Sequence, residues 1–261
     1  MKHTKAIMSG ERSGLLASCL RAALLPASWG YGLGARWKNR GFDLGTVKVH
    51  RCGVPVISVG NVTTGGTGKT PVVCYLAQKI RQQGLRVAIV SRGYRSDADT
   101  GVNDEALELH DRLPDVPHVQ DPDRVEAARV AVEELESEII LMDDGFQHRR
   151  LGRDLDIVLI DATCPFGFGH LLPRGLLREP LSSLGRADLI VISRCDQVDS
   201  TQLDRIRSVV QGIAPETPVI ESEHRPSSLR GCRGDLTASD LLQGQTVALI
   251  SGIGNPDAFQ R

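Results

Sequence analysis

Hydrophobic positions along this chain follow two alternating patterns, and together they predict the fold. In the first pattern, short apolar runs rich in β-branched side chains are bounded by glycine, proline or charged residues, which is typical of buried strands. Strands that are apolar throughout belong to a parallel sheet covered on both faces. The strands predicted in this way are residues 54–59, 86–90, 139–142, 156–160, 189–192, 218–220 and 246–250.

In the second pattern, apolar side chains recur at helical spacing, which places them on one face of a helix. One helix is expected from Pro71 to Gly84, another over residues 121–136 and a third over residues 200–210. Strands that alternate with amphipathic helices predict an α/β fold with a mostly parallel sheet. Ligands bind such sheets at the carboxyl ends of the strands, where Gly60, Ser91, Asp143 and Asp161 are expected.

The chain of 261 residues is long enough for one large or two small domains. The polar segment 97–113 is expected to be irregular, and the polar segment 221–240 to mark a domain boundary. We therefore expect an N-terminal segment over residues 1–50, the main domain over residues 51–225 and a smaller α/β domain beginning at residue 226. A lone predicted strand cannot build a core, so this second domain is expected to be incomplete.

The N-terminal segment is basic and contains the longest apolar stretch. Leucines cluster on one side of an expected helix over residues 14–25, which is interrupted by Arg21 and expected to end at Pro26. The stretch is too short to span a membrane. Two interpretations remain open, because basic flanks and nearby tryptophans suit a helix lying on a membrane, whereas an apolar face also suits packing on the protein's own core.

Composition excludes some classes of function. The formal net charge is −1 and aromatic residues make up 4% of the chain, so neither a global field nor a stacking platform indicates a nucleic-acid partner. The six cysteines have no metal-type spacing and are expected to be reduced thiols of a cytosolic protein. No feature of the sequence indicates an obligate protein partner.

The segment from residue 54 to residue 70 carries the strongest functional signal. An apolar run is followed by the glycine-rich stretch T-T-G-G-T-G-K-T and then by a helical pattern with proline in its first turn. Backbone N–H groups at such a helix N-terminus bind phosphate oxygens. The spacing matches a phosphate loop in which Lys69 reaches the β- and γ-phosphates and Thr70 binds Mg²⁺, although Thr63 stands where the strict pattern has glycine.

Two adjacent carboxylates, Asp143 and Asp144, follow the predicted strand 139–142. Nucleotide-binding proteins place the carboxylate that holds Mg²⁺ at this position, directly or through water. Neighbouring carboxylates repel each other in a dry site, so a bound cation or a raised pKa is expected there. The sequence therefore predicts a nucleotide site that uses ATP phosphates and Mg²⁺.

These motifs, with S-R-G-Y, N-D-E, D-D-G-F-Q-H, L-R-E-P and S-G-I-G-N-P in the same order, resemble the tetraacyldisaccharide 4′-kinase family. The resemblance covers nearly the whole chain from about residue 15, and threonine at position 63 is typical of that family. It implies a P-loop fold and transfer of the γ-phosphate of ATP to the 4′-hydroxyl of a tetraacylated glucosamine disaccharide 1-phosphate, giving lipid IVA in lipid A biosynthesis. It also implies a peripheral location on the cytoplasmic face of the inner membrane of Gram-negative bacteria, reached through the N-terminal segment.

The resemblance implies nucleotide and metal contacts at particular positions. Thr70, Asp143 and Asp144 would lie at the metal, with Gln147 and His148 beside them. The residues that would hold ATP phosphates are Thr63, Thr64, Gly65, Gly66, Thr67, Gly68, Lys69, Thr70 and Arg124.

The catalytic residues implied by the resemblance extend beyond the phosphate loop. Asp104 would orient or deprotonate the sugar hydroxyl, Arg178 would contact phosphates and Glu179 would support the site. Phosphoryl transfer depends mostly on positioning and charge stabilisation, so a base helps without dominating. Lys69, Asp144, Gln147 and His148 complete the implied catalytic set.

Family members continue beyond S-G-I-G-N-P with a histidine thought to pair with the carboxylate at Asp104, so the sequence as written is expected to be truncated and catalytically incomplete. A native mass that matches 28.3 kDa together with full kinase activity would exclude this. Two other functions are compatible with the residues themselves. One is a kinase of a soluble sugar or cofactor precursor, and the other is a membrane-associated switch ATPase that binds protein partners and transfers no phosphate to a sugar.

Overall fold

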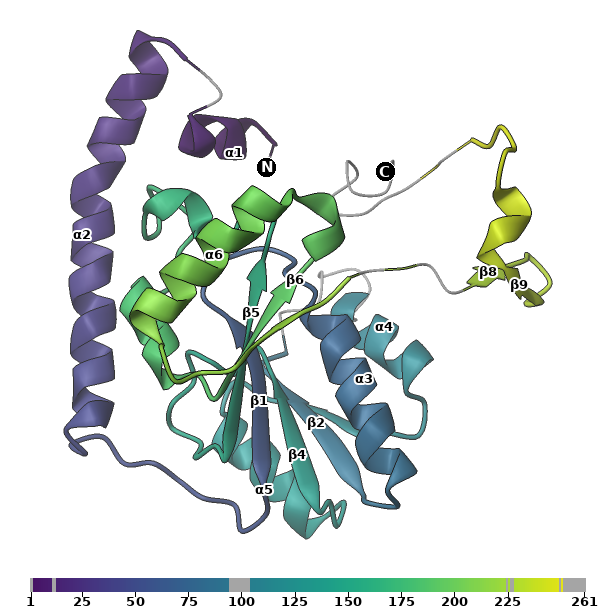
Figure 1. Ribbon diagram of the computed structural model, residues 1–261. Helices are drawn as coiled ribbons and strands as arrows, with labels where there is room; N and C mark the ends of the chain where they lie inside the picture. Colours follow the sequence, from purple (N-terminus) through teal and green to yellow (C-terminus); the bar gives the residue numbers. More distant parts are fainter. Residues whose placement is uncertain are drawn as a thin grey trace, which may run out of the picture.

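The computed structural model describes residues 2–10, 13–93, 104–223, 225, 228–248 and 250, and of residues 2–5, 104–106 and 239 only the backbone. Its centre is a seven-stranded sheet in the order β3-β2-β4-β1-β5-β6-β7, in which every neighbouring pair is parallel (Figure 1). The predicted parallel α/β fold is confirmed. The strands are β1 Val56–Asn61, β2 Val87–Ser91, β3 His118–Gln120, β4 Ile139–Asp143, β5 Leu155–Asp161, β6 Leu189–Ser193 and β7 Val219–Glu221.

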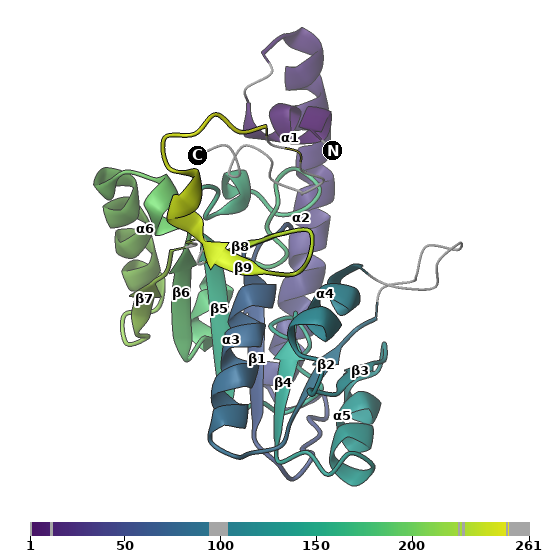
Figure 2. The same ribbon diagram turned by 90° about the vertical axis from the view of Figure 1, so that its right-hand side faces the viewer.

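Helices cover both faces of this sheet, as the apolar strands require. Figure 2 shows α3 and α4 in front of the sheet and α2 behind it. The α-helices are α1 Lys2–Ser9, α2 Leu15–Asp43, α3 Lys69–Gln82, α4 Asp104–Arg112, α5 Arg124–Glu133 and α6 Ser200–Ile213. Short 3₁₀ helices occupy Gly167–Gly169, Leu181–Arg186, Cys195–Gln197 and Ser239–Leu242.

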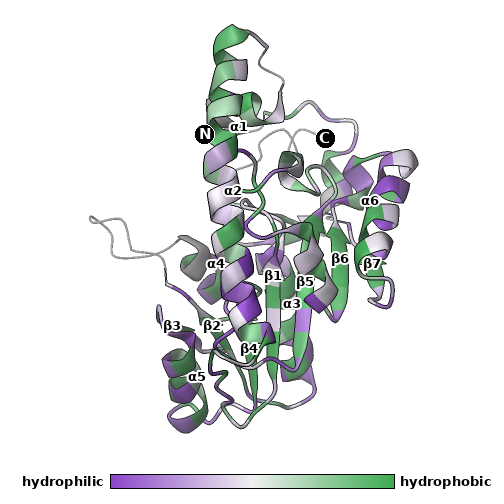
Figure 3. Cartoon of the chain, turned by 90° about the vertical axis from the view of Figure 1, so that its left-hand side faces the viewer, coloured by the Kyte–Doolittle hydropathy of each residue, from purple (hydrophilic) through white to green (hydrophobic). Residues whose placement is uncertain are grey.

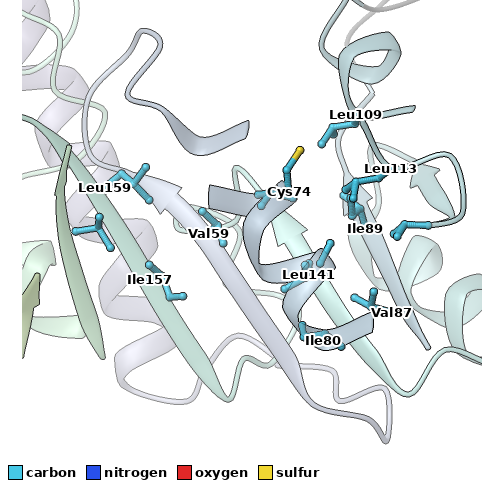
Figure 4. Close-up of a cluster of buried hydrophobic side chains, with 14 residues drawn as sticks. Val59, Cys74, Ile80, Val87, Ile89, Leu109, Leu113, Leu141, Ile157 and Leu159 are labelled. Carbon is cyan, nitrogen blue, oxygen red and sulfur yellow. The ribbon is translucent and has the colours of Figure 1, made fainter. Parts of the chain in front are cut away.

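The core on the α3 side of the sheet explains why this helix forms where the spacing predicts it. Val73, Ala77 and Ile80 lie on one face of α3 and are buried against strand residues such as Val59 and Leu141 (Figure 4). Burying a valine or isoleucine side chain contributes about 1.5–3 kcal/mol, so this face fixes α3 across the sheet. The first residue of the helix is thereby held at the carboxyl end of β1.

Two helix starts are capped by aspartate side chains. The Asp123 side chain accepts a hydrogen bond of 3.1 Å from the N–H of Val125 and caps α5, which begins at Arg124. Asp199 caps α6 through the N–H of Gln202 at 2.8 Å. Each such cap contributes about 1 kcal/mol and sets the first residue of its helix.

The expectation that the N-terminal helix ends at Pro26 is wrong. Helix α2 continues through Pro26 to Asp43. Proline removes one backbone hydrogen bond, but contacts further along hold the helix in place. The Ser28 hydroxyl donates to the carbonyl of Leu171, and a Cβ at Gly32 would lie 2.7 Å from the Leu171 side chain, so this glycine permits the close approach.

The segment 97–113 was expected to be irregular, and its second half is instead helix α4. Leu109 and Leu113 lie one turn apart and are 2% and 3% exposed, packed in the same core as α3. Two apolar side chains in a polar stretch are too few to indicate a helix before the neighbouring surface is known. Strand β3, which pairs with β2, was missed because two of its three residues, His118 and Gln120, are polar.

The predicted strand over residues 246–250 is absent from the described part of this segment. Val247 and Ile250 are exposed, and an apolar run without a neighbouring strand does not form sheet. Strands β8 Ser228–Arg230 and β9 Leu236–Ala238 instead form an antiparallel hairpin in the stretch expected to be a boundary. The division of the chain near residue 225 stays a prediction, and the S-G-I-G-N-P motif lies outside the described residues.

Candidate active site

The phosphate loop connects β1 to α3 at the carboxyl edge of the sheet. Gly65 and Gly68 have φ values of 120° and 88°, which L side chains rarely adopt, and a Cβ at Gly65 or Gly66 would meet open space. From Gly65 to Thr70, no backbone N–H donates a hydrogen bond to another described residue. These free donors lie at the N-terminus of α3, which is the positive end of its macrodipole. The loop is therefore suited to bind phosphate oxygens.

Buried polar groups at the ends of β1 and β6 hold this loop in place. Asn61 is fully buried, and its Nδ2 donates to Thr67 Oγ1 at 3.0 Å. The Ser193 hydroxyl, at the end of β6, donates to the Thr67 carbonyl at 2.8 Å. On the other side the Thr64 N–H donates to the Leu176 carbonyl at 2.7 Å, so the connection from β5 to β6 also contacts the loop. These contacts therefore fix the conformation of the loop.

Asp144 is a carboxylate beside the loop that contacts two cations. Arg178 NH1 lies 2.7 Å from Oδ1 and 2.9 Å from Oδ2 of Asp144, and Lys69 Nζ lies 3.6 Å from Oδ1. Burial acts to raise the pKa of Asp144, but the hydrogen bonds from Arg178 and the charge on Lys69 outweigh it and lower this pKa. The carboxylate stays ionised and holds both cations near the glycine-rich loop.

The backbone at Asp144 shows why this side chain points back to the loop. Asp144 has a φ of 53°, a left-handed conformation that turns the chain sharply as it leaves β4. Gly145 follows, where a Cβ would lie 2.6 Å from Ser58 Oγ, and Gly60 faces Phe146 equally closely. Close packing between the ends of β1 and β4 requires these glycines, and it brings the two motifs together.

Asp143 and Thr70 are two oxygen-bearing residues that could hold a divalent cation. Asp143 is the last residue of β4 and is 7% exposed, and Thr70 lies in the first turn of α3. Within the described residues, no group of three or more His, Cys, Asp or Glu side chains could hold a metal alone. Mg²⁺ is commonly bound by one or two carboxylates together with phosphates and water, so these oxygen donors beside the loop fit it.

Arg124 is a buried cation close to this centre. It begins α5 and is 6% exposed, and its Nε has no hydrogen-bond partner among the described residues. Burial lowers the pKa of Arg124, and the charge of Asp144 opposes this shift. A buried guanidinium N–H without a partner costs about 1–3 kcal/mol, which favours a binding role over a purely structural one.

Gln147 and His148 lie in the connection from β4 to β5, residues 144–154, hereafter the crossover. Gln147 Nε2 donates to the Asn61 carbonyl at 2.8 Å, so this side chain supports the end of β1. His148 lies further along, and burial, followed by the charges of Arg124 and Lys38, lowers its pKa to about 4. The imidazole is therefore neutral near pH 7.

Glu179 and Asp104 were the remaining predicted residues. Glu179 is 3% exposed and accepts hydrogen bonds from Asn39 Nδ2 at 3.1 Å and from Arg186 NH2 at 2.8 Å, so it connects the site to α2. Asp104 begins α4, and its side chain lies outside the described residues, as do Tyr94 and Asn103 of the motifs quoted above.

Sequence analysis missed several residues that organise the site. Asn61 connects the loop to Arg178, whose NH1 lies 3.5 Å from Asn61 Oδ1. Tyr31 donates its hydroxyl to the Arg178 carbonyl at 2.9 Å. A polar residue closing an otherwise apolar strand was the available signal for Asn61, whereas nothing in the local pattern indicated that Tyr31 or Asn39 would reach a segment so distant in the chain.

Comparison with known proteins places these features in one family. The model of the family described as tetraacyldisaccharide-1-P 4′-kinase matches residues 20–261. The tetraacyldisaccharide 4′-kinase of Anaeromyxobacter dehalogenans strain 2CP-C is 40% identical over 277 residues, which covers 100% of this chain and 73% of the relative. The enzyme of that name from Geobacter sulfurreducens is 42% identical over 277 residues, covering 98% of this chain and 74% of the relative.

The same family is found among solved structures. The crystal structure of LpxK from Aquifex aeolicus in complex with ATP is similar to this chain with a TM-score of 0.70 and 31% identity, over 92% of this chain and 76% of that one. The sequence match extends over nearly all of the chain, and the fold around the phosphate loop agrees with it. The chain belongs to the tetraacyldisaccharide-1-P 4′-kinase family and is an ATP-dependent kinase.

Proposed function

We propose that this chain transfers the γ-phosphoryl group of ATP to the 4′-hydroxyl of a tetraacylated glucosamine disaccharide 1-phosphate, which gives lipid IVA in lipid A biosynthesis. The observation that carries the proposal is the open row of backbone N–H groups from Gly65 to Thr70 beside the cluster of Lys69, Asp144 and Arg178. Family membership supports the choice of acceptor.

Binding of ATP requires the cations of this cluster to change partners. Lys69 and Arg178 both form salt bridges with Asp144, which keeps their charges next to the loop. In our proposal, phosphate oxygens accept hydrogen bonds from the loop N–H groups, and Lys69 and Arg178 then neutralise the charge that develops during transfer. Such groups act mainly by positioning and electrostatic stabilisation, because a loose phosphoryl-transfer transition state needs little covalent help.

Asp143 and the Thr70 hydroxyl would hold Mg²⁺, which when bound supplies charge neutralisation at the phosphates. Asp144, already flanked by two cations, would keep Lys69 and Arg178 oriented and complete the metal environment. Arg124 would contact phosphate with its free guanidinium N–H, and Gln147 would hold the end of β1 in place. We assign His148 and Glu179 a supporting role, since Glu179 bonds Asn39 and Arg186 rather than the loop.

The acceptor hydroxyl needs a group that orients it and takes its proton. We assign this role to Asp104, at the start of α4, because α4 and α3 pack in one core and both begin at the same edge of the sheet. A carboxylate there is suited to bind the sugar hydroxyl as it attacks phosphorus. The proton that leaves the hydroxyl then passes to this carboxylate.

The substrate is an acylated lipid, and α2 offers a surface to meet it. Its large apolar side chains point away from the protein: Leu15, Leu16, Leu33 and Trp37 are between 65% and 88% exposed. The face of α2 that is buried consists instead of Ser28, Gly32 and Asn39. In the part of the chain that is described, no helix is both long and apolar enough to cross a membrane. We propose that residues 1–50 lie on the cytoplasmic face of the inner membrane, as an interfacial helix does.

The proposal is tested by transfer of labelled γ-phosphate from ATP to tetraacyldisaccharide 1-phosphate in detergent micelles, with the protein expressed from its native gene. Lys69→Ala should lower the rate about 10²–10³-fold, as removal of one stabilising donor does elsewhere. Lys79→Ala, at the exposed C-terminal end of the same helix, is the matched control and should retain the wild-type rate. Hydrolysis of ATP without labelling of any lipid, in the presence of folded protein, would refute the kinase assignment to this acceptor and favour the switch ATPase.

A further inference from the structure

The crossover contains, near its end, a buried arginine that contacts the beginning of the same segment. This residue is Arg153, and its side chain is 10% exposed. Its NH1 lies 3.4 Å from the carbonyl oxygens of Gly145 and Phe146 and 3.3 Å from that of His148. One guanidinium group therefore holds the carbonyls of residues 145–148 together, almost out of contact with water.

A buried carboxylate holds Arg153 in place. The NH2 of Arg153 lies 3.1 Å from Oδ2 of Asp156, which is 6% exposed and lies near the start of β5. The backbone N–H of Asp156 donates to Asp188 at 2.7 Å, just before β6. Strands β5 and β6 are mostly hydrophobic along their length (Figure 3). The ion pair therefore lies beside apolar strands and is shielded from solvent.

Stability alone is a poor reason for such a pair. Burial lowers the pKa of Arg153 and raises the pKa of Asp156, in each case against the effect of the partner's charge. Removing two charges from water costs free energy that their attraction repays only in part, and an apolar pair of similar volume often stabilises a fold as well. A guanidinium group, however, is a rigid fork of donors that can hold several acceptors in one arrangement. The pair therefore points to a positional role.

The carbonyls held by Arg153 flank the two crossover residues that meet the phosphate loop and β1. Asp144, which forms salt bridges with Lys69 and Arg178, immediately precedes the first of these carbonyls. Gln147, which donates to the end of β1, lies between the other two. The left-handed backbone at Asp144 costs free energy unless its surroundings impose it. Contacts that fix the neighbouring carbonyls impose this conformation.

We propose that Arg153 is a positioning residue for phosphoryl transfer, held by Asp156 and acting through Asp144. It fixes the crossover backbone so that the Asp144 carboxylate stays in contact with Lys69 and Arg178. The inference rests on the proposed function, which gives these side chains their role at the ATP phosphates. Electrostatic groups accelerate phosphoryl transfer only when their geometry is closely held, so a small displacement of Asp144 lowers the rate.

A double-mutant cycle on Mg·ATP affinity tests this role without any acceptor. Arg153→Lys keeps the charge beside Asp156 but removes the fork that reaches the carbonyls, and should weaken Mg·ATP binding about 10-fold. In an Asp144→Asn background the same substitution should change the dissociation constant less than about 2-fold, because the group through which Arg153 acts is already lost. Isothermal titration calorimetry on the whole chain gives the dissociation constants of the cycle.

Transfer kinetics provide a readout that a purely structural role would not change. With the disaccharide acceptor, Arg153→Lys should lower kcat about 10-fold and leave KM for the acceptor unchanged. Val87→Ala is the control for lost stability, because it removes buried atoms at the amino end of β2, at the opposite edge of the sheet from the phosphate loop. Below its unfolding midpoint it should keep the wild-type kcat and Mg·ATP affinity.

A second variant approaches the same contact from the carboxylate. Asp156→Asn leaves Arg153 without its counter-ion and should weaken Mg·ATP binding severalfold, again with little further effect in the Asp144→Asn background. Unfolding midpoints of all variants show which of them are folded at the assay temperature. The Asp156→Asn cycle decides the question if Arg153→Lys does not fold.

Equal effects of Arg153→Lys in the wild-type and Asp144→Asn backgrounds would overturn the proposal, because the arginine would then not act through Asp144. Wild-type Mg·ATP affinity and kcat in the folded Arg153→Lys protein would overturn it as well. Failure of the proposed function is a different result: the wild-type protein would then label no lipid, while the calorimetric cycle would still decide the role of Arg153.

Discussion

Helices α2 and α3 lie on opposite sides of the same sheet and bury opposite kinds of side chain. α3 buries Val73, Ala77 and Ile80 and leaves its polar side chains in water. α2 buries Ser28, Gly32 and Asn39 and exposes leucines and tryptophans. The direction of the apolar face therefore shows the environment of each helix, because apolar surface is stable only where it is removed from water. α3 packs on its own core, and α2 is built to pack against something outside the protein.

The largest effect should come from the same charge placed on the apolar faces of the two helices. Ala77→Asp puts a carboxylate in a fully buried position of α3 and should lower the free energy of unfolding by more than about 3 kcal/mol. Leu33→Asp on α2 should leave stability within about 0.5 kcal/mol and reduce binding to anionic vesicles. Chemical denaturation and vesicle sedimentation measure the two quantities. Equal destabilisation by both variants would show that α2 has no outward apolar face.

A smaller effect should come from the polar contacts that hold α2. Asn39→Ala removes the hydrogen bond to the buried Glu179 carboxylate and leaves Arg186 as its remaining partner. We expect a loss of about 1.5–3 kcal/mol in unfolding free energy, the usual value for a hydrogen bond to a charged group. Asn39→Asp should destabilise at least as much, because it sets two carboxylates against each other. A neutral result for both would mean that the hydrogen bond between Asn39 and Glu179 does not stabilise the position of α2.

At neutral pH the smallest effect should come from His148 beneath α2, whose contribution to stability depends on pH. Its pKa is about 4 in the folded protein and 6.5 in the unfolded chain, so the unfolded state binds a proton first as pH falls. Stability should be fully present above pH 6.5 and decline between pH 6.5 and about 4. His148→Gln should flatten this decline in unfolding midpoints measured across the range, whereas His110→Gln, at an exposed position, should preserve it. An unchanged slope in His148→Gln would place the titrating group elsewhere.

Local patterns in the sequence were sufficient for much of the fold and of the nucleotide site. The phosphate loop, the carboxylates after β4 and the helix after Pro71 were predicted because neighbouring residues determine each of them. The prediction that the N-terminal helix ends at Pro26 was wrong, because contacts with Leu171, far along the chain, hold α2 in place beyond the proline. The strand predicted at residues 246–250 failed for the converse reason, since an apolar run forms sheet only when a neighbouring strand is present.

The sequence by itself determined which residues could bind phosphate, which strands would be buried on both faces, and, through its motifs, the family. Those features depend on residue type and short-range spacing. Only the tertiary structure decided that Arg178 and Lys69 share Asp144 and that Asn61 connects the loop to Arg178. It also decided that the apolar side of α2 faces outward while its polar side is buried. Each of these joins segments distant in the chain, and a helix with one apolar face carries no local signal of whether that face meets a core or a membrane.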